Sequence, residues 1–349
     1  MPSFRSATVV AELSARPGLQ RVETDLGRAY VLTDLTGPVE VGDRVVVNTT
    51  AVELGLGTGG WHVVHWNLER ESWAEAGPGH IMKLRYTSLQ ADTGAVEELE
   101  AGVLAEATDL GGLPVVACGL HSQVPCVAAA LKHAVPDAKV AYVMTDGAAL
   151  PMALSDLVVA MRAAGLVDAT LTAGQAFGGE HEAVNVPSAL LAARHVAGAD
   201  VAIVGMGPGV VGTATTFGYS AVEVGPVLDA ADLLGGRPVA ALRFSLADER
   251  LRHQGVSHHT RTALSLATRA RATIGIPKGA WEDRVRADLD AAGLGDRHRV
   301  VAVDDPDVPA LLERLGVHVT TMGRGPTDDP GFYAVAGAAG TVAASLIGS

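Results

Sequence analysis

The stretch that decides the fold is DVAIVGMGPGVVG, which runs from Asp200 to Gly212. An apolar run of strand length is followed at once by a polar, glycine-rich segment. The pattern recurs along most of the chain, and segments of helix length, such as Ala149–Leu166, separate the apolar runs. Strands that alternate with helices predict an α/β fold, with a mostly parallel sheet and helices on both faces. The other apolar runs are LPVVACG, KVAYVMTD, DATLTAG, RPVAALRFS, ATIGIP, HRVVAVD and VHVTTMG.

The first 75 residues show a different pattern. Short segments rich in β-branched residues, among them SATVVAELSA and DRVVVNTTAVELGLG, are separated by turn residues. This pattern predicts a small antiparallel β domain, barrel-like, over residues 1–75. The segment ERESWAEAGPGH, residues 69–80, is charged and then rich in Gly and Pro, which indicates a linker. We therefore expect the α/β domain to occupy residues 80–349.

Composition limits the class of protein. The 349 residues carry a net charge of −13, and 48% of them are hydrophobic, yet no apolar run reaches the roughly 18 residues of a membrane-spanning helix. An acidic chain also lacks the basic surface that nucleic-acid binding requires. The N-terminus has no apolar signal sequence, and two cysteines, Cys118 and Cys126, are too few for a disulfide framework. We expect a cytoplasmic protein that binds neither nucleic acid nor membrane.

Function is expected at the carboxyl ends of the strands, where open α/β sheets bind their ligands. Directly after one predicted strand, Gly207, Gly209 and Gly212 form a G-x-G-x-x-G pattern, which is typical of dinucleotide binding. The residues that follow, TATTFGYS, are poor helix formers, and no acidic residue stands where a ribose would need it. A loop that approaches some other ligand closely is therefore favoured over a dinucleotide site, and turn geometry alone is the alternative. The sequence identifies no cofactor.

The segment RFSLADERLRHQGVSHHT, Arg243–Thr260, stands out against the acidic background. Residues 243–271 contain six arginines against one Asp and one Glu, a local balance of +4. Ser257 is a suitable helix N-cap, and a helix N-terminus favours anions. We expect a phosphate or carboxylate site here, although acidic neighbours such as Asp248 and Glu249 could instead neutralise the arginines. The predicted ligand-binding side chains are Arg243, Arg250, Arg252, His253, Ser257, His258 and His259.

Metal binding is not predicted, because the spacing of the candidate ligands is unfavourable. His258 and His259 are adjacent and should point apart on a helix, and His253 is five residues from His258, which is not one helical face. Cys118, His121 and Cys126 also lack a recognised zinc spacing. A composite site that joins Cys118 or His121 to His258 remains an alternative.

Three residues near strand ends are candidates for proton transfer. Asp146 ends a predicted strand, His121 follows another, and Glu180 lies in the polar segment GQAFGGEHEAVN. A carboxylate and a histidine at neighbouring strand ends could act as acid and base. Each residue taken singly is also compatible with a cap or turn role.

Several segments together resemble one family. They are GHIMKLRYTSLQ, TDGAALP, GQAFGGEHEAVN, GPGVVGTATTFGYS, SLADERLRHQGVSHHT and TMGRGPTDDPGFYAVAGAAG, and they extend over nearly the whole chain. The chain resembles the bacterial family known as domain of unknown function 3866. The resemblance implies no activity, cofactor or catalytic residue, but it indicates that these segments belong together.

The pattern as a whole favours an enzyme that acts on a small anionic metabolite, with a phosphorylated one as the narrower case. The alternatives are a non-catalytic regulator that senses such a metabolite, and a protein that docks a partner through its N-terminal domain. The late apolar segment Phe332–Gly348 predicts a closely packed terminal helix, or else an interface in a homo-oligomer.

Overall fold

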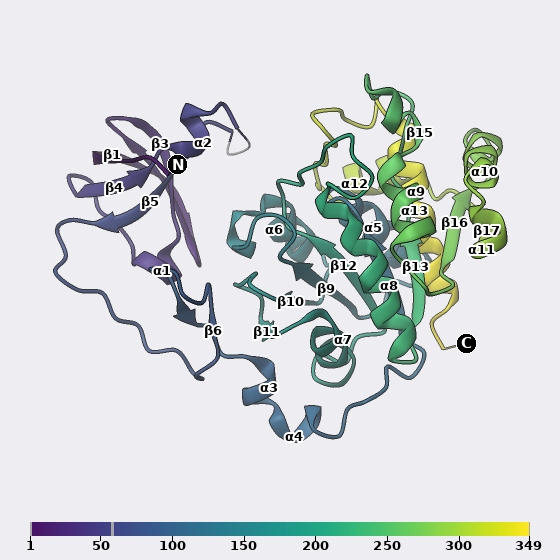
Figure 1. The fold of residues 1–349 in the computed structure, drawn as a ribbon, viewed down its shortest axis with the longest axis horizontal. Helices are drawn as coiled ribbons and strands as arrows, with labels where there is room; N and C mark the ends of the chain where they lie inside the picture. The colour runs from purple at the N-terminus through teal and green to yellow at the C-terminus, as the bar shows by residue number, and fades with distance from the viewer. Residues whose placement is uncertain (1, 57–58, 349) are drawn as a thin grey trace. The chain divides into compact units, whose positions relative to one another are not determined.

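The computed structural model describes residues 2–56 and 59–348, and it divides into two compact units, Met1–Gly94 and Ala95–Ser349 (Figure 1). The predicted linker, residues 69–80, thus falls inside the first unit. The predicted fold class is confirmed: a small barrel precedes a large unit built on a parallel sheet with helices on both faces.

The first unit is a closed barrel in which the strands follow the order β1-β2-β3-β5-β4. Among the described strand pairs of the barrel, β3–β5 is parallel and the others are antiparallel. The long strand β1 pairs with both β2 and β4, and irregularities in its register near Val9 and Glu12 let it bend around the barrel. Valines from alternate positions fill the interior. The elements are β1 Phe4–Arg16, β2 Leu19–Thr24, β3 Gly27–Val31, α1 Thr33–Thr36, β4 Arg44–Asn48, α2 Thr50–Glu53, β5 His62–Asn67, β6 Met82–Lys83 and β7 Ala91–Asp92.

The second unit is built on a sheet with the strand order β11-β10-β9-β12-β8-β13-β16-β17, in which every neighbouring pair is parallel. Its central strands are apolar on both faces, as a sheet covered on both sides requires. The strands are β8 Pro114–Cys118, β9 Val140–Thr145, β10 Ala169–Ala173, β11 His181–Ala183, β12 Val201–Met206, β13 Arg237–Ala241, β16 Thr273–Pro277 and β17 Arg299–Val303.

One predicted strand is wrong. The segment VHVTTMG, residues 317–323, is irregular and makes only an isolated bridge between Thr321 and Arg324. Its apolar pattern has another cause, because Val317 and Val319 are buried in the core beneath the helices on one face of the sheet. The alternation that suggested pairing with the sheet therefore reflects side-chain burial in an irregular segment.

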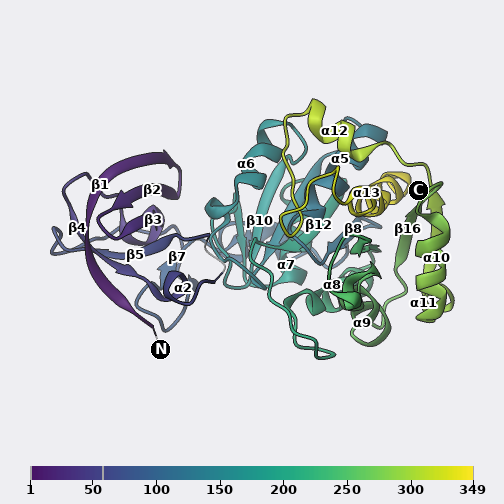
Figure 2. The same ribbon diagram turned by 90° about the horizontal axis from the view of Figure 1, so that it is seen from above.

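Helices cover the sheet in two groups, and Figure 2 shows α5, α12 and α13 on one side and α8 and α9 on the other. Alternate residues of one strand face different cores: Val116 and Cys118 pack with the first group, and Val115 and Ala117 with the second. The first group is α5 Gln123–Ala134, α6 Asp156–Ala163, α12 Val308–Arg314 and α13 Pro330–Ser345. The second is α7 Val186–His195, α8 Val224–Leu233, α9 His258–Leu266, α10 Glu282–Ala291 and α11 Leu294–Arg297. Two short helices, α3 Val96–Leu99 and α4 Ala101–Leu104, precede the sheet.

The terminal helix α13 is buried along most of its length. Its glycines allow close packing: a Cβ on Gly340 would lie 2.1 Å from the carbonyl oxygen of Val127 in α5. The apolar surface of α13 is therefore covered within this chain. Among the residues that the structure describes, no helix is long and apolar enough to cross a membrane.

The order of the strands determines where a site can form. In the strand order β9 lies two places from β8, because β12, which comes later in the chain, occupies the place between them. The next strand of the sheet, β13, then pairs with the other edge of β8. The connection after β8 runs through α5 on one face, whereas those after β12 and β13 run through α8 and α9 on the other. Connections that diverge in this way leave room at the carboxyl ends of β12, β8 and β13.

Candidate functional site

The basic segment begins at the carboxyl end of β13 and folds back on itself. After Arg243, β14 Phe244–Ser245 pairs antiparallel with β15 Gly255–Val256, and the short 3₁₀ helix η3 Leu251–His253 lies between them. Ser257 then caps α9, because its Oγ accepts a hydrogen bond from the backbone N–H of His259 at 3.2 Å. The predicted N-cap is confirmed, and the hairpin returns the chain to the carboxyl end of β13.

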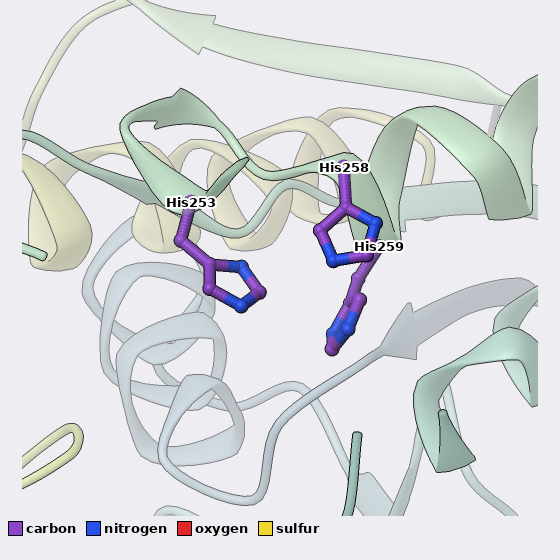
Figure 3. Close-up of side chains that lie close together, drawn as sticks. All are labelled: His253, His258 and His259. Carbon is purple, nitrogen blue, oxygen red and sulfur yellow. The ribbon is translucent and has the colours of Figure 1, made fainter. Parts of the chain in front are cut away.

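This hairpin brings His253, His258 and His259 together as a triple-histidine cluster (Figure 3). The ring centroids are 5.0 Å apart for His253 and His258, 4.8 Å for His253 and His259, and 4.3 Å for His258 and His259. One ring nitrogen from each residue lies within 4.8 Å of the others. The expectation that His258 and His259 point apart is wrong. His253 belongs to η3 rather than to the helix, so helical spacing did not apply to it.

The hydrogen bonds of the three rings differ. Nδ1 of His253 lies 2.7 Å from Oγ of Ser257. The ring of His259 stacks on Tyr219 at 3.9 Å with an interplanar angle of 4°, and Nδ1 of His259 lies 3.4 Å from Arg243 Nη1. Nε2 of His258 and Nε2 of His259 are buried and have no hydrogen-bond partner in the described part of the chain. Two ring nitrogens therefore lack the partner that buried polar atoms normally have.

Burial, reinforced by positive neighbours, keeps these rings neutral. It lowers the pKa of both His253 and His259 to about 3, and it also lowers the pKa of His258. Among the neighbours, Arg243 acts on all three histidines in the same direction as burial. Near pH 7 each ring thus carries one nitrogen with a free lone pair, the form that accepts hydrogen bonds or binds metal ions.

The arginines of the segment are partly neutralised by Asp248, whose side chain is only 2% exposed. Arg250 donates two hydrogen bonds to this carboxylate, at 2.9 and 2.8 Å, and Arg243 and Arg324 lie 3.6 and 3.5 Å from it. The hydrogen bonds from Arg250 hold the pKa of Asp248 well below its usual range. The alternative raised in the sequence analysis, that acidic neighbours neutralise the arginines, therefore holds for Arg250.

Neutralisation is incomplete, however. Arg324 also pairs with Asp329 at 3.2 Å, so Arg243, Arg250 and Arg324 share two carboxylates. Arg252 adds a fourth positive charge near Arg243, which leaves a surplus of +2. Nε of Arg252 is buried and unpaired within residues 2–56 and 59–348. We call the three predicted arginines of this segment, together with the triple-histidine cluster, the Arg–His cluster: Arg243, Arg250, Arg252, His253, His258 and His259.

The glycine-rich loop, Gly207–Gly212, reaches two different places. Gly207 and Gly209 line a cavity of about 190 Å³ together with Leu120, His121 and the irregular residues 320–322. Gly212 instead packs on the Arg–His cluster, because a Cβ at this position would lie 2.8 Å from Cε1 of His259. No helix starts directly after the loop: a turn and the 3₁₀ helix η2 Ser220–Glu223 come first. This differs from a dinucleotide fingerprint, in which the loop opens a helix.

His121 lies in the other region that the loop reaches, and its ring is fully bonded. Nδ1 lies 3.2 Å from both the hydroxyl of Tyr142 and the carbonyl oxygen of Met206, and Nε2 lies 2.6 Å from Oγ of Ser155. Ser155 in turn caps α6 by accepting the N–H of Val158. Burial lowers the pKa of His121 to about 4. These contacts tie His121 into the fold, and none of them is made to the Arg–His cluster.

The two predicted acidic residues lie apart from each other. Asp146 is exposed at the carboxyl end of β9, where it accepts the backbone N–H of Gln175 at 2.9 Å. Glu180 precedes β11, pairs with Arg162 at 2.6 Å and accepts the N–H of Thr170 near the start of β10. Glu180 thus lies at the amino ends of the parallel strands, and the structure does not bring it to the Arg–His cluster.

Sequence reasoning gave no role to Glu223, the last residue of η2. Its Oε1 accepts a hydrogen bond from Thr145 at 2.5 Å, and burial, with a further contribution from Asp146, raises its pKa to about 7. The segment that carries Glu223 begins beside Tyr219, which stacks on His259. No spacing in the sequence indicates this placement, because Thr145 and Glu223 are 78 residues apart.

Fold and site together define a class of protein: a small barrel joined to a parallel α/β unit, with histidines and arginines gathered at a switch point of the sheet. The chain belongs to the family described as "Protein of unknown function (DUF3866)", which matches residues 28–340. The resemblance noted in the sequence is thereby confirmed. Neither a curated protein nor a solved structure matches this chain.

Proposed function

We propose that this protein is a cytoplasmic enzyme that acts on a small anionic metabolite, held at the Arg–His cluster beside the glycine-rich loop. The observation that carries the proposal is Nε of Arg252, a buried cationic donor without a partner among the described residues. A buried donor left unsatisfied costs roughly 1–3 kcal/mol, and more when it is charged. A phosphate or carboxylate oxygen would remove that penalty and offset the surplus charge of +2.

The surroundings of Arg252 support an anion rather than a neutral ligand. Asp248, the buried carboxylate of this segment, already accepts two hydrogen bonds from Arg250 and lies close to Arg243 and Arg324. It therefore has little capacity left for a further guanidinium group. The two free thiols, Cys118 and Cys126, support a reducing compartment.

For proton transfer, the sequence singled out Asp146, His121 and Glu180, and we add Glu223. Strands β9 and β13 are separated by β12 and β8, so Asp146 and Arg243 start roughly 14 Å apart across the sheet. Glu223 lies at the same end of β9, where its carboxyl group accepts a hydrogen bond from Thr145, but it is buried, and its 3₁₀ segment begins next to Tyr219, whose ring stacks on His259. A carboxyl group with a pKa of about 7 can both give and take a proton near neutral pH.

Calorimetric titration with inorganic phosphate, followed by a panel of phosphorylated and carboxylated metabolites, tests the anion site. Because a charged hydrogen bond contributes about 1.5–3 kcal/mol, Arg252→Ala should weaken anion binding roughly 10- to 100-fold. Arg286→Ala, which removes an exposed arginine paired with Glu282 on α10, is the matched control and should leave binding unchanged. Equal anion affinity in the Arg252 variant and the wild type would refute the site.

Turnover distinguishes an enzyme from a regulator. Glu223→Gln should keep the affinity for the metabolite that the panel identifies and lose most of its conversion, since the amide cannot exchange a proton in this way. Binding without any conversion by the wild type would instead favour the non-catalytic regulator. Failure of every anion to bind would leave partner docking through the N-terminal unit as the better hypothesis.

A further inference from the structure

We infer that His253, His258 and His259 form a binding site for a divalent transition-metal ion of the zinc class. The inference rests on the placement of the three rings, and it stands whether or not the substrate of the protein is an anion. It goes beyond the anion site, because it assigns the ring nitrogens to a cation.

The first support is geometric. One nitrogen from each ring lies within 4.8 Å of the other two. A zinc ion holds imidazole nitrogens at about 2.0–2.1 Å, which in a tetrahedral arrangement places them roughly 3.3 Å from each other. Small rotations of the three rings therefore suffice to reach coordinating distance. Figure 3 shows the rings from η3 and from the first turn of α9 gathered around a common space.

The second support is the pair of unpartnered nitrogens. His259 is only 5% exposed, and its Nε2, like that of His258, has no hydrogen-bond partner in the described structure. Metal coordination would satisfy such a nitrogen through its lone pair. In His259 coordination through Nε2 places the ring proton on Nδ1, so the 3.4 Å contact between Nδ1 and Arg243 Nη1 would be given up. Without a metal, each Nε2 is left either as a proton donor without an acceptor or as a lone pair without a donor, and both atoms are buried.

The third support comes from the groups that hold the rings. His253 has its Nδ1 against Oγ of Ser257 at 2.7 Å, so Nε2 is the nitrogen that would coordinate the metal. His259 is fixed by the stacked ring of Tyr219, whose hydroxyl donates to the carbonyl oxygen of His259 at 2.9 Å. Metal-binding histidines typically have the second nitrogen hydrogen-bonded and the ring orientation fixed in this manner.

The ligand set also indicates the kind of metal and its use. Imidazole suits zinc, cobalt, nickel and copper better than magnesium or calcium, which prefer oxygen ligands. Three protein ligands leave a coordination position open, as catalytic zinc sites do. Arg243 and Arg252 lie close by and repel a dication, so an oxygen anion in the open position would strengthen metal binding. Asp248 provides a buried negative charge that acts on His253.

The test is titration of the full-length, metal-free protein with cobalt(II) alone and then with zinc(II). We expect one equivalent of cobalt to bind with the intense visible absorption of a low-coordinate site, and zinc to displace it. His258→Ala changes the half-buried member of the cluster and should weaken cobalt binding at least about 100-fold. His133→Ala, on an exposed position of α5, is the matched control and should bind as the wild type does.

A second measurement, on the wild type alone, tests the metal site even if the His258 variant fails to fold. Nuclear magnetic resonance of the ring nitrogens in the wild type should show one nitrogen in each of three histidines shifting as zinc is added. No bound equivalent of cobalt or zinc, or equal affinity in the His258 variant and the wild type, would overturn the inference.

The metal site and the anion site fail in different ways. Arg252→Ala should weaken phosphate binding and leave cobalt binding in phosphate-free buffer intact. Cobalt binding without any anion binding would support the metal site and refute the proposed function. Phosphate binding by a protein that takes up no cobalt would support the anion site and refute the metal site.

Discussion

Two regions at the carboxyl edge of the sheet are centred on buried histidines, yet their hydrogen bonding is opposite. His121 bonds to Tyr142, Met206 and Ser155, so both of its nitrogens have partners. In the triple-histidine cluster, two Nε2 atoms have none among residues 2–56 and 59–348. Since folded proteins satisfy nearly all buried polar atoms, His121 serves the fold, whereas the unpartnered nitrogens support the ligand site that we propose for the cluster.

Charge separates the same two regions. The partners of His121 are a phenol, a hydroxyl and a backbone carbonyl, all of them neutral. The triple-histidine cluster lies beside arginines that Asp248 and Asp329 offset in part. A satisfied neutral environment stabilises a fold, and a surplus of one sign favours a ligand of the other.

The largest effect is expected from the carboxylate beneath the Arg–His cluster. Asp248→Asn leaves Arg243, whose side chain is 8% exposed, without its buried counter-charge. Removal of one partner from a buried ion pair costs about 3–5 kcal/mol, which denaturant titration should reveal. Phosphate should restore part of the lost free energy of unfolding, and its stabilising effect should be larger in this variant than in the wild type. A variant as stable as the wild type would mean that the charges of this region are solvated.

A matched pair of histidine variants tests the contrast directly. His121→Ala should lower the free energy of unfolding of the metal-free protein by about 3 kcal/mol, because it leaves a cavity and removes the partner of Ser155. His258→Ala should change it by less than about 1 kcal/mol, because its Nε2 has no partner to lose in the described chain. Equal losses in denaturant titration would remove the distinction between the two regions.

The pH dependence of stability sharpens the contrast. In the folded state the pKa of Glu223 is raised to about 7, so its stabilising contribution is present below its unfolded value of 4.5 and is lost as the pH rises through 7. His121, His253 and His259 have lowered pKa values, so their contribution is present above 6.5 and is lost as the pH falls toward 4 and 3. The two contributions therefore oppose each other: as the pH rises from about 5 to about 8, the histidines add stability and Glu223 removes part of that gain.

The variant Glu223→Gln isolates the contribution of Glu223. The difference in free energy of unfolding between the wild type and this variant should change by about 1 kcal/mol, in the direction of lower wild-type stability, as the pH rises from about 6 to about 8. The contribution of the histidines should be the same in both proteins, since the histidines remain. Denaturant titrations of both proteins across this range provide the measurement, and a difference that stays constant would assign the titration to another group.

The smallest effect is expected at the glycine-rich loop. Gly212→Ala places a Cβ against Cε1 of His259, so the ring must shift and the packing loss is about 1 kcal/mol. Affinity for phosphate and cobalt should fall roughly 10-fold, measured by the same titrations. Gly102→Ala, where a Cβ would meet open space, is the control. Unchanged affinity would show that the ring of His259 need not hold its position.

Much of the architecture follows from local pattern. Short apolar runs separated by helices predict a sheet buried on both faces, since only such a sheet needs strands without polar alternation. The cap at Ser257 and the place of Arg243 after a strand were also predicted, because both depend on neighbouring residues. The segment Val317–Gly323 was mispredicted as a strand, since burial of alternate side chains in an irregular segment produces the same pattern.

Two features were decided only by the tertiary structure. The hairpin of β14 and β15 brings His253 onto the rings of His258 and His259, although helical spacing suggested that they diverge. The insertion of β12 beside β9 brings η2 and Glu223 to Thr145.

The sequence by itself therefore determined the fold class, the cap of α9 and the concentration of basic residues after β13. The partners of each buried polar atom were determined by the order of strands in the sheet and by the path of one hairpin. The physical reason is range: periodicity and capping act over a few residues, whereas hydrogen bonds and charge pairs depend on which distant segments the packed core holds together.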